Sequence, residues 1–254
     1  MSLGGRCALV TGGTSGIGRA CVERLVADGM RVAFTGRDPE RGADVAAQTG
    51  ARFVCADACD REAIKRSVTD TAAAADGRID VLVLNAGILM SGPLAETPRA
   101  AFGELLDVNL TAGFLYARAC LPIMRAQGGG AIVHIASDAG IRGVHELAAY
   151  SVTKAGAIAL SDLLAAEGAP HGIRSNAVCP GDTVPGVQAT PRGFEDHAED
   201  AAAWTLPPSG RFTTGAEVAA LVAFLARDEA AHISGATIRI DGAGGAALIA
   251  STRS

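Results

Sequence analysis

The chain has 254 residues, of which 49% are hydrophobic and 19% are charged, and its formal net charge is −5. This balance excludes a disordered chain, and the acidic net charge disfavours the basic groove that nucleic-acid binding needs, so we expect no nucleic-acid partner. We also expect no membrane partner, because no run approaches the roughly 18 consecutive apolar residues of a bilayer-spanning helix. A strand pattern begins near residue 7, which leaves no room for a signal peptide and favours a cytoplasmic location.

Short β-branched runs alternate with helical stretches along the whole chain. The predicted strands are Cys7–Thr11, Arg31–Thr35, Arg52–Ala56, Val81–Leu84, Ala131–Ala136, Ser175–Val178 and Thr237–Ile240. The predicted helices are Gly18–Asp28, Pro39–Gln48, Arg61–Ala75, Thr97–Gln127, Tyr150–Ala169 and Gly215–Arg227. This alternation predicts an α/β fold with one doubly wound, Rossmann-like, parallel seven-stranded sheet and helices on both faces. Because no linker divides the pattern, we expect residues 1–254 to form a single domain.

A glycine-rich turn, Thr11-Gly12-Gly13-Thr14-Ser15-Gly16-Ile17-Gly18, follows the first predicted strand and leads into a helix. Glycines allow a tight turn with positive φ, and they let backbone N–H groups at a helix N-terminus approach a pyrophosphate closely. The spacing is G-x-x-x-G-x-G and not the usual G-x-G-x-x-G of dinucleotide-binding folds. The position of the turn, between strand and helix, nevertheless indicates a phosphate site.

The second predicted strand ends in Phe34-Thr35-Gly36-Arg37-Asp38. NAD-binding folds usually place an acid here to bind the ribose 2′-hydroxyl, but Gly36 occupies the expected position. Arg37 suits a 2′-phosphate by charge and geometry, while Asp38 before Pro39 suits a helix N-cap. We therefore expect NADP in preference to NAD.

Tyr150 and Lys154 lie four residues apart at the start of a predicted helix, so both side chains project from one helix face. A nearby ammonium stabilises a phenolate and lowers the pKa of the phenol, which makes tyrosine a usable general acid/base. The chain has only one other lysine, Lys65, and otherwise uses arginine as its base. A lysine at this position indicates that a compact ammonium is needed there.

Ser137 follows the fifth predicted strand, at the edge of the sheet where open α/β folds place their sites. Its hydroxyl is placed to hold a substrate oxygen on which charge develops. His134, within that strand, is interpreted as a core residue and not as a base.

Together these motifs resemble the short-chain dehydrogenase/reductase family from residue 6 to about residue 242. TGGTSGIG resembles its cofactor turn, Asn85-Ala86-Gly87 its N-N-A-G motif, and Tyr150 with Lys154 its Y-x-x-x-K motif. Asn109 in D-V-N-L and Pro180-Gly181 after the sixth strand also match. Leu84 departs from the family, which usually has Asn there, and this should perturb local hydrogen bonding more than the chemistry. A second disagreement is Ser15, where NADP-preferring relatives often carry a basic residue.

The resemblance implies the roles of the site residues. The catalytic residues would be Asn109, Ser137, Tyr150 and Lys154, with Asn109 anchoring a water that relays protons through Lys154. The cofactor would contact Gly12, Thr14, Ser15, Gly16, Ile17, Gly18, Arg37, Asp57, Ala58, Asn85, Ala86, Gly87, Tyr150, Lys154, Pro180, Gly181 and Thr183. Asp57 would contact the adenine. The resemblance further implies a homo-oligomer, a dimer or tetramer.

The expected function is hydride transfer between NADP(H), or NAD(H), and a small ketone or secondary alcohol. The alternative is a non-catalytic nicotinamide-binding protein that senses redox state or forms a scaffold. We expect the substrate to be covered by residues around Leu89–Leu94 and by a substrate loop, about 182–214, which contains four prolines. Trp204 and Leu206 are candidates for an apolar wall of the substrate site, and Asp138, His145 and Glu146 for its polar contacts.

Two further features have simple interpretations. The glycine-rich tail, 241–254, is expected either to fray or to pack at a subunit interface. The six cysteines form no C-x-x-C pair, and the five histidines show no H-E-x-x-H spacing, so we predict no metal site. We interpret the cysteines as buried free thiols of a reducing compartment.

Overall fold

The structure, a computed structural model, describes residues 3–184 and 206–246. Its main sheet contains β1 (Cys7–Val10), β2 (Arg31–Gly36), β3 (Arg52–Cys55), β4 (Val81–Leu84), β5 (Gly130–Ile135), β6 (Ile173–Pro180) and β9 (Thr237–Ile240). The α-helices of the described residues are α1 (Gly16–Ala27), α2 (Pro39–Thr49), α3 (Arg61–Ala73), α4 (Arg99–Leu106), α5 (Ala112–Ala126), α6 (Asp138–Ile141), α7 (Ala148–Gly168) and α8 (Gly215–Ala226). All seven predicted strands are confirmed, with ends that differ by two residues at most.

The strand order is β3-β2-β1-β4-β5-β6-β9, and every neighbouring pair is parallel. The chain moves outward from β1 to β3 in one direction and then returns to place β4 on the other side of β1. This reversal is the switch point at which open α/β sheets bind their ligands. The predicted doubly wound, Rossmann-like fold is confirmed.

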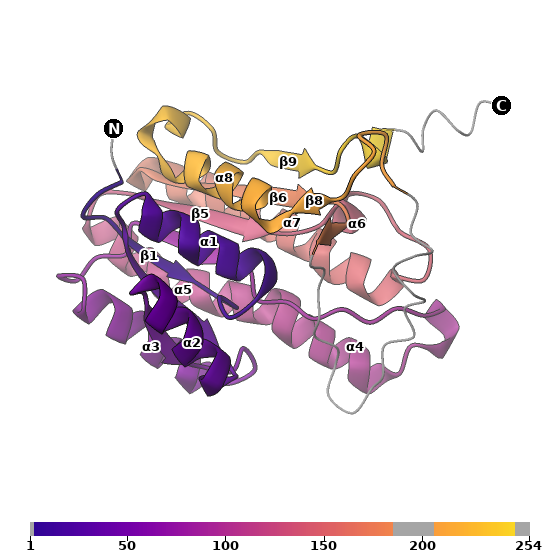
Figure 1. Cartoon of the computed structure of the whole chain (residues 1–254), viewed down its shortest axis with the longest axis horizontal. Helices are drawn as coiled ribbons and strands as arrows, with labels where there is room; N and C mark the ends of the chain where they lie inside the picture. Colours follow the sequence, from indigo (N-terminus) through magenta and orange to yellow (C-terminus); the bar gives the residue numbers. More distant parts are fainter. Residues whose placement is uncertain (1–2, 185–205, 247–254) are drawn as a thin grey trace.

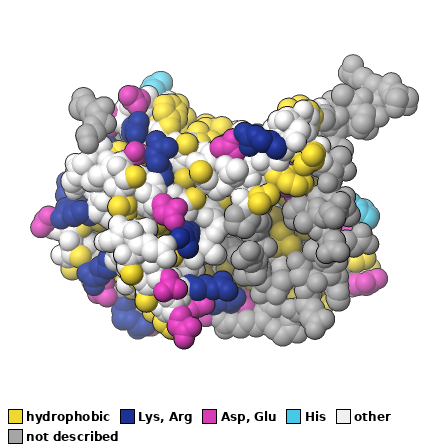
Figure 2. Space-filling view, in the orientation of Figure 1, with side chains coloured by type: hydrophobic (Ala, Val, Ile, Leu, Met, Phe, Trp, Pro, Cys, Tyr) yellow, Lys and Arg dark blue, Asp and Glu magenta, His cyan; other side chains and the backbone are white. Residues whose placement is uncertain are grey.

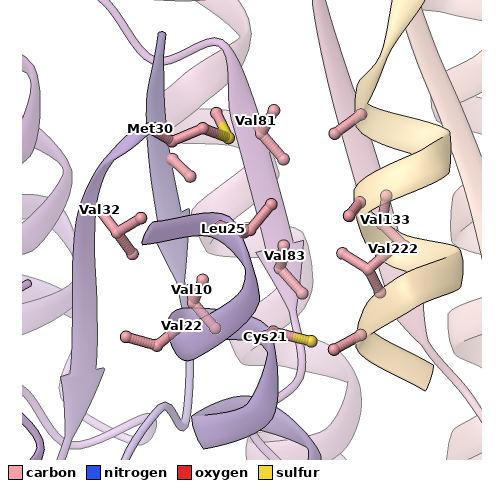
Figure 3. Close-up of a cluster of buried hydrophobic side chains, with 14 of the residues drawn as sticks. Val10, Cys21, Val22, Leu25, Met30, Val32, Val81, Val83, Val133 and Val222 are labelled. Atoms are coloured by element: carbon pink, nitrogen blue, oxygen red, sulfur yellow. The ribbon is translucent and has the colours of Figure 1, made fainter. Parts of the chain in front are cut away.

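Helices cover both faces of the sheet (Figure 1). On one face, α1, α2 and α8 pack on the strands, and the other face carries α3, α5 and α7. Figure 3 shows the first of these two cores, in which the side chains of α1 and α8 meet the central strands. Its labelled members include Val10, Cys21, Val22, Leu25, Val83, Val133 and Val222, each fully buried. Burying one such aliphatic side chain contributes about 1.5–3 kcal/mol, so the sheet is a rigid platform for whatever lies at its edge.

The predicted helix Thr97–Gln127 is confirmed as a helical run from Arg99 to Ala126, which begins two residues later than predicted and contains a π-helical turn. Thr97 has extended backbone because the following proline disfavours helical geometry, and α4 begins at Arg99. A π-helical turn, Asp107–Thr111, joins α4 to α5, with right-handed helical backbone on both sides of it. Such turns are frequent at functional sites, and this one contains Asn109.

Two segments predicted to lack regular structure have some. Within the predicted loop 182–214, β7 (Thr183–Val184) pairs in parallel with β8 (Thr213–Thr214), and residues 185–205 lie outside the described residues. In the tail, the Asp241 carboxylate accepts hydrogen bonds from the backbone N–H groups of Ala243 and Gly245, so the first residues form an ordered turn. Residues 247–254 lie outside the description.

The surface and the cysteines complete the description. On the face shown in Figure 2, basic and acidic side chains are interspersed over α1 and α2. Within residues 3–184 and 206–246, no helix has the length and apolarity that crossing a membrane requires.

Four cysteines are buried, but Cys55 and Cys59 are exposed because they flank the turn that follows β3. This corrects the expectation of six buried thiols.

Candidate active site

A cavity of about 600 Å³ opens at the carboxyl ends of β1, β2, β4, β5 and β6. It spans the switch point between β1 and β4, the position expected for a ligand in this topology. Every predicted catalytic or cofactor-binding residue lines the cavity except Gly18 and Asn109. Residues that sequence reasoning missed also line it, among them Thr35, Arg41, Ile88, Val108, Arg142 and Leu147.

The glycine-rich turn forms the floor of the cavity between β1 and α1. Gly12 and Gly16 have φ of 66° and 52°, which favour glycine, and a Cβ on Gly12 would lie 2.9 Å from Ala86 Cα. A Cβ on Gly18 would overlap the carbonyl oxygen of Gly12 and the amide of Asn85. Gly18 therefore packs beneath the turn and does not face the cavity, which corrects its predicted role.

Hydrogen bonds fix this turn to the end of β4. Thr11 Oγ1 accepts from the backbone N–H groups of Asn85 and Ala86, at 2.9 and 3.0 Å. The Asn85 side chain donates in turn to the carbonyl oxygens of Thr11 and Gly12, both at 3.0 Å. The turn is thus held open with the N-terminus of α1 directed into the cavity, an arrangement that favours an anion.

Two arginines lie at the rim beyond β2. Arg37 and Arg41 are both exposed and both line the cavity. Asp38 accepts hydrogen bonds from the backbone N–H groups of Glu40 and Arg41, both at 3.1 Å, which confirms the predicted N-cap of α2. A Cβ on Gly36 would lie 2.5 Å from Thr14 Cγ2, so an acidic side chain at position 36 would collide with the phosphate-binding turn.

Ser137, Tyr150 and Lys154 meet at the opposite end of the cavity. Ser137 follows β5 and caps α6, accepting a hydrogen bond from the backbone N–H of Ala139 at 3.2 Å. Tyr150 and Lys154 lie in the first two turns of α7 and are almost fully buried, at 6% and 4% exposed. Lys154 Nζ lies 5.5 Å from the centre of the Tyr150 ring and donates a hydrogen bond to the carbonyl oxygen of Ile135 at 3.0 Å.

Burial governs the protonation of this group. It raises the pKa of Tyr150 above its ordinary value, although a hydrogen bond with Ser137 partly opposes the shift. This corrects the expectation of a lowered tyrosine pKa, because desolvation of the phenolate outweighs its stabilisation by neighbouring groups. Burial lowers the pKa of Lys154 to about 8. Burial, and then the Lys154 ammonium, lowers the pKa of His134 to about 3, which fits its interpretation as a core residue and not as a base.

Asn109 lies behind the main cavity and not in its wall. Its Oδ1 accepts from the backbone N–H of Ile88 at 2.8 Å, and its Nδ2 donates to Ile88 O at 2.9 Å and to Thr153 Oγ1 at 3.0 Å. A Cβ on Gly87 would lie 3.4 Å from both Asn109 Oδ1 and Lys154 Nζ, so Asn109 and Lys154 converge on Gly87. With its side chain committed to these bonds, Asn109 ties the π-helical turn to the loop after β4.

Beyond Ser137, the cavity wall combines charged and apolar side chains. Asp138, Arg142 and Asp182 supply the charges, whereas Ile88, Leu89, Val108, Val144 and Leu147 supply the apolar part. Other expectations for this region were wrong. His145 is 94% exposed in its side chain and lies outside the lining with Glu146, and Leu94 and Leu206 are also exposed and outside it. Trp204 lies outside the described residues.

Only some of the missed residues carry a sequence signal that could have identified them. Arg142 lies four residues after Asp138, the spacing of an ion pair on one helix face, and its Nη2 donates to Asp138 Oδ2 at 2.9 Å. Arg41 lies one turn after Arg37. The apolar members carry no signal of this kind, because a lining side chain and a core side chain look alike in sequence.

Comparison with known proteins gives consistent matches over nearly the whole chain. Residues 12–244 match a family model described as Enoyl-(Acyl carrier protein) reductase. A D-threitol dehydrogenase of Mycolicibacterium smegmatis is 37% identical over 94% of this chain and 93% of its own length. The 3-oxoacyl-(acyl-carrier-protein) reductase FabG of Salmonella typhimurium is 34% identical over 95% and 98%. A crystal structure of levodione reductase superposes with a TM-score of 0.87 at 33% identity, covering 96% of this chain and 99% of the other.

Proposed function

We propose, since this chain belongs to the short-chain dehydrogenase/reductase family of oxidoreductases, that it transfers hydride between NADP(H) and the carbon of a ketone or secondary alcohol. The observation that carries the proposal is the meeting of Ser137, Tyr150 and Lys154 at one end of a cavity whose other end is suited to phosphates. The matched relatives named above are a dehydrogenase and reductases, which supports this class of chemistry. The non-catalytic alternative has no such support.

The residues of the cavity fit a nicotinamide dinucleotide. A Cβ on Gly12 would press against Ala86, so glycine keeps the turn in the position that a pyrophosphate needs, and the N-terminus of α1 offers backbone N–H donors around Ser15 and Gly16. Asp57 and Ala58 would border the adenine, and Asn85, Pro180 and Thr183 would line the path toward Lys154. When bound, the nicotinamide supplies or accepts the hydride.

NADP is proposed over NAD for electrostatic reasons. Arg37 and Arg41 place two guanidinium groups at the rim where the second strand ends, and both suit a 2′-phosphate. The nearest carboxylate, Asp38, is engaged by the α2 backbone and by Arg41 Nε at 3.3 Å, so it is less available to a ribose hydroxyl. Gly36 stands where NAD-binding folds place an acid, and a side chain at this position would require Thr14 to move.

The protein's own groups handle the proton. Tyr150 keeps its phenolic proton at neutral pH because burial raises its pKa, so it is ready to donate that proton to a ketone oxygen. Ser137 is placed to donate a hydrogen bond to the same oxygen as negative charge develops on it. Lys154, still mostly protonated at pH 7, stabilises the phenolate that remains. Asn109 acts indirectly, by fixing the loop beside Lys154.

Assembly and location are also proposed. The outer faces of α5 and α7 expose Phe114, Val152 and Leu163 at 49%, 56% and 61%. Such side chains on two packed helices support a homo-oligomer, a dimer or tetramer. We further propose a cytoplasmic location for it. Sedimentation at micromolar concentration tests the assembly, and a monomer there would contradict it.

The function is tested by titrating the protein with NADPH and with NADH and following cofactor fluorescence. We expect NADPH to bind more tightly, and Arg37→Ala and Arg41→Ala each to weaken it by about 10- to 100-fold while leaving NADH unchanged. Arg52→Ala, an exposed arginine at the start of β3 outside the cavity, is the matched control. Tighter binding of NADH than of NADPH, unchanged in both arginine variants, would overturn the proposed choice of NADP. Binding of neither cofactor would overturn the proposed function.

A further inference from the structure

The Ser137 hydroxyl has one proton and several candidate acceptors, one of which is the Tyr150 hydroxyl. Besides the substrate oxygen proposed above, Asp138 Oδ1 lies 3.3 Å from Ser137 Oγ and receives its hydrogen bond in this structure. That distance is long for an O–H···O bond, which is usually about 2.7–2.8 Å, so the interaction is weak and easily exchanged. When Ser137 turns its proton to a substrate, Asp138 Oδ1 loses its donor.

Arg142 fixes the other half of the carboxylate. Its Nη2 donates to Asp138 Oδ2 at 2.9 Å, and the Arg142 backbone N–H donates to the Asp138 carbonyl oxygen at 3.2 Å, closing the short helix α6. The side chains of Asp138 and Arg142 are only 17% and 30% exposed, and both line the cavity. The carboxylate is therefore held with Oδ2 engaged and Oδ1 directed at Ser137.

We infer, on the basis of the proposed function, that Asp138 binds a hydroxyl group on the carbon next to the reacting carbon, so that the enzyme prefers α-hydroxy ketones and vicinal diols. Ser137 Oγ and Asp138 Oδ1 are separated by about one hydrogen-bond length. The two oxygens of a vicinal diol are similarly close to each other. One can therefore meet Ser137 and Tyr150 while the other donates to Asp138.

The charge at this end of the cavity narrows the substrate further. Asp138, Asp182 and Arg142 lie close enough to influence one another, and with the Lys154 ammonium at the same end of the cavity their ionised forms sum to no net charge. An ionised carboxylate only accepts hydrogen bonds, so Oδ1 can use a hydroxyl but not an ether or a second carbonyl. Val144 and Leu147 also line the cavity and would contact the carbon skeleton of the substrate. The substrate class is a hydroxylated ketone.

The test uses three ketones that differ at one position: 3-hydroxybutan-2-one, 3-methoxybutan-2-one and butan-2-one. The hydroxy and methoxy compounds activate the carbonyl similarly, but only the first can donate a hydrogen bond. We expect kcat/KM of the wild type to be about 10- to 100-fold higher for the hydroxy ketone than for the methoxy ketone. In Asp138→Asn, Arg142 draws the amide oxygen and leaves the NH₂ facing Ser137, so the preference collapses to about threefold or reverses.

Two comparisons separate specificity from structure. A structural loss would lower all three rates together, whereas the inference predicts that Asp138→Asn lowers kcat/KM for the hydroxy ketone at least about tenfold more than it lowers kcat/KM for butan-2-one. Asp28→Asn removes an aspartate that pairs with Arg24 at i,i+4 spacing and also with Arg227, at the same 17% exposure but outside the cavity, and should keep the preference. A wild type that does not distinguish the hydroxy and methoxy ketones would overturn the inference, as would a preference that survives in Asp138→Asn.

A binding measurement keeps this result separate from the proposed function. The wild type, with NADPH present so that neither alcohol can be oxidised, is titrated with butane-2,3-diol and with butan-2-ol by calorimetry. Tighter binding of the diol, lost in Asp138→Asn, supports the inference without any turnover, and equal binding of the two alcohols overturns it. Failure of the wild type to reduce any of the three ketones would instead count against the proposed hydride transfer.

Discussion

Lys154 Nζ donates a 3.0 Å hydrogen bond to the backbone carbonyl oxygen of Ile135, the last residue of β5. A buried ammonium is thereby fixed to the sheet at the point where the strand leads to Ser137. Burial lowers the pKa of this ammonium from 10.5 to about 8, which means that keeping it charged at neutral pH costs about 3 kcal/mol of stability. The charge is retained at a cost to the fold, as expected for a functional group.

Lys154→Met should therefore be inactive and yet more stable than the wild type at pH 7. Losing the buried charge gains about 3 kcal/mol, and leaving the Ile135 carbonyl without its donor costs about 1–2 kcal/mol, so the free energy of unfolding should rise by about 1–2 kcal/mol. Urea unfolding at pH 7 measures it. The difference in the free energy of unfolding between Lys154→Met and the wild type should narrow between pH 8 and 10.5. In this range the unfolded wild type binds more protons at Lys154 than the folded state does, so the wild type becomes more stable as pH rises. A gap that widens with pH would contradict this assignment.

The same titration should appear in the rate. Reduction requires the Lys154 ammonium and the Tyr150 phenol, and the pKa of Tyr150 lies above its ordinary value, so Lys154 loses its proton first as pH rises. We expect kcat/KM for ketone reduction to be level near neutral pH and to fall as pH rises through about 8. Steady-state rates between pH 6 and 10 measure this. A profile that stays level beyond pH 9.5 would show that the lysine charge is not needed.

Tyr150→Phe should lose activity without losing cofactor binding. The phenylalanine ring fills the same buried space, but no proton donor then faces the substrate, so the rate should fall by about 10²- to 10⁴-fold. The matched control is Tyr116→Phe, since Tyr116 is the other tyrosine, is also buried, and makes only long hydrogen bonds of 3.4 Å to Ser67 and Thr35. NADPH affinity within about twofold of the wild type in both variants confirms that the fold is retained. Comparable rates in the two variants would remove Tyr150 from the mechanism.

The sequence was sufficient for the parts of this protein that depend on periodicity and local chemistry. Buried parallel strands appear as apolar runs, and a Gly-rich turn or an Asp-Pro pair carries its own geometric reason, as the N-cap at Asp38 shows. Four-residue spacing placed Tyr150 and Lys154 on one helix face. These features need no knowledge of distant contacts.

The features that were missed depend on tertiary contacts. The π-helical turn at Asn109 accompanies bonds to Ile88 and Thr153, which are 21 and 44 residues away in sequence. The expected lowering of the Tyr150 pKa failed because spacing reveals a neighbouring charge but not the depth of burial that opposes it. Leu89 and Leu94 look alike in sequence, and only the fold shows that the first lines the cavity while the second is exposed.

Gly18→Ala should damage both stability and cofactor binding, although alanine normally favours a helix. A Cβ at position 18 would overlap Gly12 O and Asn85 Nδ2, so the turn must shift, at a cost of about 1–3 kcal/mol. Gly103→Ala, within α4, is the control because a Cβ there meets nothing within 4 Å, and it should stabilise the protein by about 0.5–1 kcal/mol. Thermal unfolding and NADPH titration of the two variants give opposite results if this geometry is correct. If Gly18→Ala and Gly103→Ala were both more stable than the wild type, the turn would be looser than the structure shows.

The exposed thiols provide a direct probe of the adenine end of the cavity. Cys55 and Cys59 are exposed, whereas Cys7, Cys21, Cys120 and Cys179 are buried, and burial raises the pKa of each of these four, to about 11 for Cys7 and Cys179. A thiol reagent at pH 8 should therefore modify two of the six cysteines of the native protein, and all six after unfolding.

Cofactor binding should slow this modification. Ala56, Asp57 and Ala58 lie between the two exposed cysteines and line the cavity, so a bound adenine would restrict access to the turn. Cys55→Ser and Cys59→Ser assign the two reactions, and NADPH at saturation should slow one or both by about tenfold or more. Unchanged rates with NADPH bound, as judged by its fluorescence, would place the adenine elsewhere and would contradict the role given to Asp57.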